Sequence, residues 1–146
     1  MDKRFDCLKL DRQLCFPLYA AARKVIGQYA EPLEKLGLTY TQYVVMMVLW
    51  EEKSVSVKEL GRRLYLDSGT LTPLLKTMEK KGLVLRARSK EDERVVNVSL
   101  SFEGEALRER ALSVPAEVSA CVRLPEEDAQ KLYELLYELL ASIEDR

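Results

Sequence analysis

Residues 56–104 read SVKELGRRLYLDSGTLTPLLKTMEKKGLVLRARSKEDERVVNVSLSFEG, and this stretch decides the fold. Ser56 and Glu59 have the spacing of a capping box, in which each side chain satisfies a free backbone N–H of the other residue. They predict a short helix over 57–64. A turn of about three residues leads into a second helix, which ends where Gly82 follows two lysines. Two short helices joined in this way predict a helix-turn-helix.

The residues after this pair of helices have the pattern of a hairpin. Apolar and polar residues alternate within 83–88 and again within 95–100, as they do in strands. The segment between them, 89–94, is entirely polar. A β-hairpin that directly follows a helix-turn-helix is typical of a wing.

Helices are predicted on both sides of this winged core. Thr39 and Gln42 form a second capping-box pattern, and the strongly apolar residues after it indicate a helix that is buried on most sides. The last helix carries a wide leucine stripe that no later element can cover. We expect helices at 14–29, 40–50, 101–122 (bent or broken near Pro115) and from Pro125 onward. The fold class is therefore mainly α with a small β-wing.

Composition removes several classes of function. The 146 residues suit one domain, and 47% hydrophobic with 32% charged residues is typical of a soluble globular protein. The sequence has no histidine, which excludes imidazole catalysis and imidazole metal ligands. Three cysteines without CxxC spacing predict neither a zinc site nor a disulfide framework. With no membrane-length apolar run and no signal-peptide pattern, we expect a cytoplasmic protein that is not an enzyme and uses no metal or cofactor.

Charge is distributed unevenly along the chain. Residues 57–94 hold ten Lys or Arg and six Asp or Glu, within a chain whose net charge is −1. An ordinary solvated surface explains this as well as a face for a polyanion, and the helix-turn-helix favours the polyanion.

The candidate DNA contacts follow from the winged helix-turn-helix. The first residues of its second helix meet base edges in the major groove, where hydroxyl groups can donate and accept, while Lys76, Lys80 and Lys81 suit phosphates. Arg94 at the wing tip is placed to enter a minor groove, with Asp92 to orient it; a surface ion pair worth ~0–1 kcal/mol is the alternative. Helix capping is the alternative role for the hydroxyl groups. The candidates are Ser68, Gly69, Thr70, Thr72, Lys76, Lys80, Arg86, Arg88, Asp92 and Arg94.

The same residues carry a family resemblance. The winged core resembles that of the MarR repressor family, which has its wing signature where this chain has Asp92-Glu93-Arg94. Three further segments resemble the organic hydroperoxide-sensing branch, the OhrR-type repressors, and the likeness extends from about Leu10 to Ile143. These segments are QLCF at 13–16, LTYTQY at 38–43 and LDSGTLTP at 66–73.

The resemblance implies an interlocked homodimer of the MarR type that reads a pseudo-palindromic operator in double-stranded DNA. It implies a single domain over 1–146, with dimerisation helices in 10–54 and 101–146 and the winged helix-turn-helix in 55–100. The uncovered leucine stripe of the last helix is an independent reason to expect a dimer.

Cys15 is the candidate sensor. Taken alone it could be an inert buried cysteine, but it lies at the start of a helix, where the partial positive charge favours the thiolate, with Tyr19 one turn on. The resemblance implies a peroxide-reactive cysteine at this position, with Tyr29 and Tyr40 bonding its sulfur partly across the dimer. It also places Cys121 where two-cysteine members keep a resolving thiol. Cys7 has no counterpart and is expected to be an exposed thiol in a disordered end of the chain.

We therefore predict a transcriptional repressor with an organic hydroperoxide as inducer: the hydroperoxide oxidises the reactive cysteine, and the repressor then releases its operator. Two alternatives within the fold are a MarR-type regulator released by a small aromatic ligand and a thiol-based global or virulence regulator of the staphylococcal type. A thiol peroxidase is the alternative of another class, but those enzymes support their cysteine with arginine and threonine in a strand-rich fold.

Overall fold

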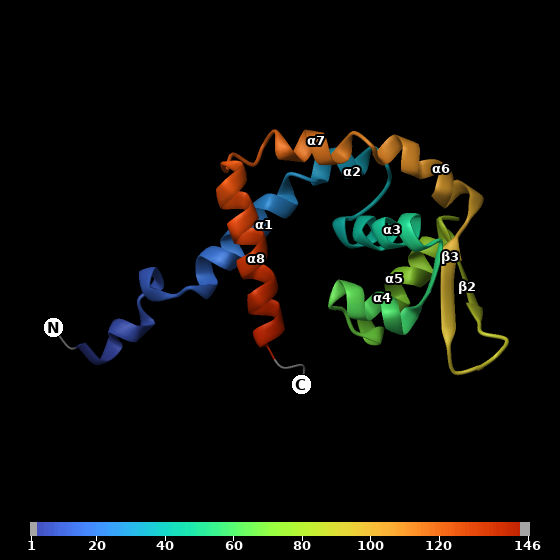
Figure 1. Cartoon of the computed structure of the whole chain (residues 1–146), viewed down its shortest axis with the longest axis horizontal. Helices are drawn as coiled ribbons and strands as arrows, with labels where there is room; N and C mark the ends of the chain where they lie inside the picture. Colours follow the sequence, from blue (N-terminus) through green and yellow to red (C-terminus); the bar gives the residue numbers. More distant parts are fainter. Residues whose placement is uncertain (1–2, 144–146) are drawn as a thin grey trace.

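The computed structural model describes residues 3–143; the ends of the domain expected over 1–146 lie outside the described residues. Figure 1 shows α2 and α7 along one edge, with α1 and α8 extending from one end of that edge and a winged lobe from the other. Every helix of residues 3–143 is too short or too polar to span a membrane. In chain order the elements are η1 (Lys3–Leu8), η2 (Leu10–Arg12), α1 (Cys15–Gly27), α2 (Ala30–Glu34), α3 (Tyr40–Glu52), β1 (Ser54–Ser56), α4 (Val57–Leu64), α5 (Ser68–Lys80), β2 (Val84–Arg88), β3 (Val96–Leu100), α6 (Phe102–Ala111), α7 (Val114–Ser119) and α8 (Glu126–Ser142).

Helices α4 and α5 form the predicted helix-turn-helix. The side chain of Ser56 accepts from the N–H of Glu59 at 3.1 Å, as expected for an N-cap. The expected capping box also needs the Glu59 side chain to accept from the N–H of Ser56. The Glu59 carboxylate instead pairs with Arg62. Tyr65 has a φ of 56° and turns the chain between the two helices.

The sheet has one strand more than the sequence predicts. Strands β2 and β3 form the expected antiparallel hairpin, with Arg86 opposite Val98 and Arg88 opposite Val96. Strand β1 pairs with the other edge of β3, so the order is β1-β3-β2. Strand β1 has only three residues, which is too short for an alternating pattern, so the sequence does not predict it.

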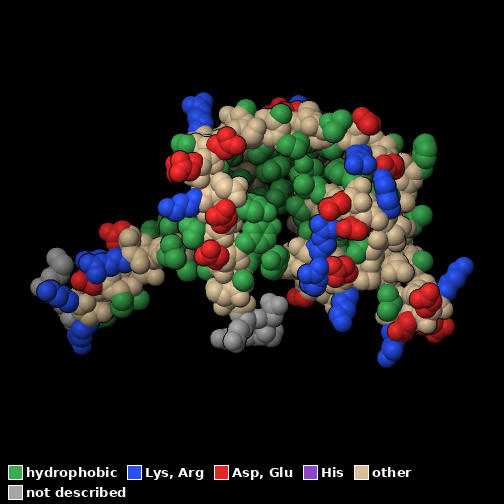
Figure 2. Space-filling view, viewed as in Figure 1, with side chains coloured by type: hydrophobic (Ala, Val, Ile, Leu, Met, Phe, Trp, Pro, Cys, Tyr) green, Lys and Arg blue, Asp and Glu red, His purple; other side chains and the backbone are tan. Residues whose placement is uncertain are grey.

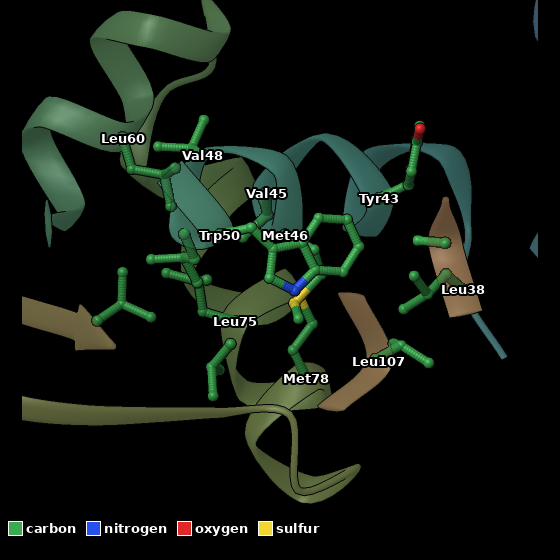
Figure 3. Close-up of a cluster of buried hydrophobic side chains, with 14 of the residues drawn as sticks. Leu38, Tyr43, Val45, Met46, Val48, Trp50, Leu60, Leu75, Met78 and Leu107 are labelled. Atoms are coloured by element: carbon green, nitrogen blue, oxygen red, sulfur yellow. The ribbon is translucent and has the colours of Figure 1, made fainter. Parts of the chain in front are cut away.

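Helix α3 is the centre of the hydrophobic core. Its capping box is complete, and seven of its residues are buried. Figure 3 shows Val45, Met46 and Val48 of this helix among side chains from α4, α5 and α6. The indole N–H of Trp50 donates to the carbonyl oxygen of Gly104 at 2.9 Å, which ties α3 to α6.

The helices at the two ends of the chain differ from this core. The expected helix over 101–122 is broken into α6 and α7, with Pro115 in the first turn of α7. Pro125 is the N-cap of α8, one position before the first helical residue. Within residues 3–143, neither α1 nor α8 contributes a buried residue, and most of their leucines and aromatic side chains are exposed.

Candidate functional site

The recognition helix α5 presents one polar face. The Asp67 carboxylate caps it by accepting from the N–H of Thr70 at 2.7 Å, and this bond lowers the pKa of Asp67. The N-cap of α5 is therefore Asp67 and not a hydroxyl group, which leaves the Ser68 hydroxyl for other contacts. Ser68, Thr72, Lys76 and Lys80 recur at intervals of four residues and are exposed, while Leu71 and Leu75 face the core.

The wing tip presents one arginine. Arg94 donates to both oxygens of Asp92, with its Nε 3.1 Å and its Nη2 3.2 Å from them, and its side chain remains 91% exposed. These bonds lower the pKa of Asp92. The expected Asp92–Arg94 contact is therefore present, and it holds a guanidinium that points into solvent. Figure 2 shows Lys and Arg side chains projecting from the lobe and from the wing tip.

Two other basic residues of the wing contact the protein itself. Arg86 is partly buried and donates to the Glu79 carboxylate at 3.2 Å, which links β2 to the recognition helix. Arg88 donates to the carbonyl oxygen of Glu93 at 2.8 Å, across the base of the wing tip. Both candidate residues therefore also stabilise the wing.

Lys81, the C-cap residue of α5, is exposed and is hydrogen-bonded to another part of the chain. The sequence interpretation made it a phosphate contact, but its ammonium donates to Gly37 and to Gln42 of the same chain. The phosphate contact stays a prediction, because the residue is exposed and its ammonium carries three donors. The structure adds a contact within the chain, to the turn after α2 and to α3.

An aromatic cluster lies at the corner between α2 and α3. The ring centroids of Tyr29 and Tyr40 are 4.8 Å apart. The ring centroid of Tyr43 lies 5.9 Å from that of Tyr29 and 6.4 Å from that of Trp50. Burial, and next the neighbouring Tyr29, raise the pKa of Tyr40. Two of the expected sensor tyrosines are thus together. Tyr43 was missed, although its spacing three residues after Tyr40 places both on one helix face.

Cys15 lies apart from these tyrosines. It is an exposed free thiol at the start of α1, whereas Tyr29 follows the other end of that helix. A helix rises 1.5 Å per residue, so the Cα atoms of the two residues are about 20 Å apart. The Tyr19 hydroxyl accepts from Arg23 at 3.4 Å, and its ring faces the same guanidinium. Within one chain, Cys15 therefore cannot reach the tyrosine pair.

The other two cysteines are also free and exposed. Cys121 follows α7, and its sulfur lies 3.6 Å from the carbonyl oxygen of Glu117. Cys7 belongs to the 3-10 helix η1, so this end of the chain is folded where the sequence suggested disorder. No group of His, Cys, Asp and Glu among residues 3–143 has the arrangement of a metal site.

A capped recognition helix beside an arginine-tipped wing defines the winged-helix class of DNA-binding regulators. The model of the family "Transcriptional regulator SarA/Rot" matches residues 28–110. Over 146 residues the chain is 45% identical to the organic hydroperoxide resistance transcriptional regulator of Bacillus subtilis (strain 168), covering 100% of this chain and 99% of that protein. The chain belongs to the MarR-type winged-helix regulators, in their organic hydroperoxide-sensing branch.

Solved structures support the same assignment. Reduced AbfR bound to DNA has a TM-score of 0.77 and 35% identity, covering 93% of this chain and 95% of that chain. Disulfide-formed AbfR has a TM-score of 0.65 and 34% identity, covering 92% and 95%. AbfR is a protein of Staphylococcus epidermidis. The predicted function as a redox-sensing, DNA-binding repressor is confirmed at this level, and the relatives are regulators rather than peroxidases.

Proposed function

We propose that two copies of this chain form a repressor that holds operator DNA while Cys15 is reduced and releases it when an organic hydroperoxide oxidises that thiol. Each thiol reacts once per cycle of reduction, so the protein is a sensor rather than an enzyme. Because its partner is operator DNA, we place it in the cytoplasm. The main support for this proposal is the position of Cys15, an exposed thiol at the start of a helix. The tyrosines able to activate it lie beyond its reach within one chain, so we propose that they come from a second chain.

Dimerisation is supported by the uncovered apolar side chains of α1 and α8. Figure 2 shows hydrophobic side chains exposed along these helices and in the hollow between α8 and the lobe. Contiguous apolar surface of this kind marks an interaction site. A second copy would cover it with the same elements, and we retain 10–54 and 101–146 as the segments that supply the dimer contacts, around a winged helix-turn-helix at 55–100.

A dimer would also complete the sensor. Cys15 of one protomer and the Tyr29–Tyr40 pair of the other can meet if the first helices cross between subunits. Hydroxyl groups that donate to a thiolate stabilise it, which lowers the pKa of a thiol without any histidine. Tyrosine activation therefore suits a chain in which histidine is absent.

The chemistry is a two-electron oxidation of sulfur. The Cys15 thiolate attacks the outer oxygen of ROOH, the S–O bond forms as the O–O bond breaks, and the alkoxide takes a proton to leave as ROH. The product is a sulfenic acid. If Cys121 of the other subunit then attacks this sulfur, an S–S bond forms and water leaves.

DNA binding would use the exposed face of α5 and the wing tip. Ser68 and Thr72 are placed for base edges, Lys76 and Lys80 for phosphates and Arg94 for a minor groove. The half-sites would lie about one helical turn apart, ~10 bp, because two lobes related by two-fold symmetry enter successive major grooves on one side of the duplex.

A mobility shift on the operator tests the proposal. Wild type and Cys7→Ser should bind when reduced and release after one equivalent of cumene hydroperoxide, whereas Cys15→Ser should bind and stay bound. Release of Cys15→Ser by peroxide would contradict the sensor assignment. Release of every variant by a small aromatic acid, with no response to peroxide, would favour the ligand-released regulator instead.

Non-reducing electrophoresis tests the role of Cys121. Oxidised wild type and Cys7→Ser should show a covalent dimer that Cys121→Ser lacks. A disulfide needs Cα atoms within ~7 Å, so its formation would require the two subunits to bring these residues together. A covalent dimer that persists in Cys121→Ser, or none in wild type, would leave a one-cysteine mechanism.

A further inference from the structure

A single ammonium joins the end of the recognition helix to the corner between α2 and α3. Lys81 is the C-cap residue of α5, and its Nζ donates to the Gly37 carbonyl oxygen at 2.7 Å and to Gln42 Oε1 at 2.9 Å. Hydrogen bonds from a charged donor are about twice as strong as neutral ones. We call these three residues the Lys81 junction.

Both acceptors are fixed by other bonds. Gln42 is only 4% exposed, and its Oε1 also accepts from the N–H of Thr39 at 3.1 Å as part of the α3 capping box. Gly37 has a φ of 69°, a conformation that favours glycine, and ends α2 with an N–H bond to Glu34. The junction therefore connects one helix end to a rigid corner rather than to a flexible loop.

The two tyrosines flank the segment that contains Gly37, because Tyr29 is the N-cap residue of α2. The carbonyl oxygen of Tyr29 accepts from the N–H of Leu33 in α2, and Tyr40 is the first residue of α3. Their rings contact each other 4.8 Å apart. A displacement of this pair acts on the two ends of that segment, and the Gly37 carbonyl oxygen within it is bonded to Lys81.

We infer that Lys81 is a positioning residue that transmits the state of the tyrosine pair to the recognition helix. This rests on the proposed function, in which oxidation of Cys15 changes what the tyrosine hydroxyl groups contact. Helix α5 is continuous from Ser68 to Lys80, with Pro73 inside it, so a shift of its C-terminal end is carried along the helix to Ser68 and Thr72. Small shifts at an effector site become discrete rearrangements when they act through packed elements.

The test compares operator affinity in the reduced and oxidised states of Lys81→Met, with Lys80→Met as the matched control on the exposed face. Lys81→Met keeps the aliphatic stem but removes the ammonium. We expect its oxidised-to-reduced ratio of Kd to fall about 3- to 30-fold below that of wild type, the range in which single residues modulate coupling between sites. Its rate of thiol oxidation should stay at the wild-type value, since Cys15 is untouched.

Gln42→Glu changes the residue that accepts the hydrogen bond of Lys81. A carboxylate keeps the acceptor for both Lys81 and Thr39, so the ratio should be retained, and this variant decides the matter if Lys81→Met does not fold. A ratio lost in Gln42→Glu while Lys81→Met keeps it would contradict the proposal.

The remaining outcomes separate this proposal from the proposed function. Equal loss of affinity in both states of Lys81→Met, with a salt slope reduced by about one, would mean that the ammonium contacts phosphate, and would overturn the junction alone. A wild-type ratio in Lys81→Met would also overturn it. If wild type itself keeps its operator after oxidation, the proposed function fails and the junction fails with it.

Discussion

The winged lobe (α3 to α6) and the terminal helices (α1 and α8) use hydrophobic residues in opposite ways. In the lobe, Val45, Met46 and Val98 are fully buried within the chain. In the terminal helices, Leu132 is 46% and Leu135 51% exposed, and Leu14 just before α1 is 78% exposed. The lobe closes its core inside one chain, whereas the terminal helices present an apolar surface that the described part of the chain leaves uncovered.

The sensor residues are divided between these two regions. Tyr40 begins α3 and packs at the edge of the lobe, while Cys15 begins α1. In the proposed function, the thiol that reacts therefore belongs to the uncovered helices, and the tyrosine that activates it belongs to the lobe. We therefore propose that a sensor divided in this way acts on the lobe through subunit contacts.

The largest effect should come from charging the terminal helices. Leu132→Asp combined with Leu135→Asp would place four carboxylates in the proposed two-fold interface. It would also forfeit about 3–6 kcal/mol of apolar burial, since each leucine is about half exposed and full burial of a leucine contributes about 1.5–3 kcal/mol. Light scattering should show a monomer, and a mobility shift should show that it no longer binds the operator. Lys131→Asp changes the charge by the same amount on the same helix and should remain a dimer. If the double variant is still a dimer, the leucines of α8 do not supply the dimer contacts.

The next effect should come from the closed core of the lobe. A Cβ at Gly104 would lie 2.1 Å from the carbonyl oxygen of Leu83, so Gly104→Ala should lower the free energy of unfolding by about 3 kcal/mol. Gly27 in α1 has nothing within 4 Å of such a Cβ, and Gly27→Ala should change stability by less than about 1 kcal/mol in either direction. Urea denaturation of both variants measures the difference, and equal stabilities would contradict it.

A binding effect should appear without any change in assembly. Arg94→Ala should weaken operator binding by roughly 1–3 kcal/mol, because the exposed guanidinium held by Asp92 is lost. Lys80→Ala should act mildly and lower the salt slope by about one. Fluorescence anisotropy at several salt concentrations distinguishes the two. If Arg94→Ala binds like wild type, the wing does not touch DNA.

The smallest effect concerns acid. Hydrogen bonds lower the pKa of Asp67 from its ordinary value of 3.8, so its contribution to stability is complete above about pH 4 and is lost as the pH falls through the lowered pKa. Asp67→Asn keeps an N-cap acceptor but cannot titrate. Its free energy of unfolding should therefore fall less than that of wild type between pH 5 and pH 2. Parallel curves would show that the cap does not depend on the charge.

The sequence predicts the lobe well because its signals act over a few residues. The Asp67 cap, the Thr39 capping box and the Gly82 terminator each involve partners within four or five positions. Long-range contacts leave no such signal. Strand β1 is identified only by its pairing with β3, and the hydrogen bond of Lys81 depends on Gln42, thirty-nine positions earlier.

The sensor shows the same limit. Sequence spacing can place Tyr19 one turn from Cys15, but the structure shows the Tyr19 hydroxyl bonded to Arg23. The family resemblance names Tyr29 and Tyr40, and the structure brings them together with Tyr43. The separation of Cys15 from this cluster follows from the continuous course of α1, which a list of motif residues does not contain.

Mixed dimers test the shared sensor most directly. One is made of wild type and a chain that carries Cys15→Ser, Tyr29→Phe and Tyr40→Phe together; the other of a Cys15→Ser chain and a Tyr29→Phe/Tyr40→Phe chain. If the tyrosines activate the thiol of the partner, the second dimer should oxidise one Cys15 at the wild-type rate with cumene hydroperoxide and the first should react slowly. The reverse order of rates would show that each chain activates its own thiol, and would contradict the account.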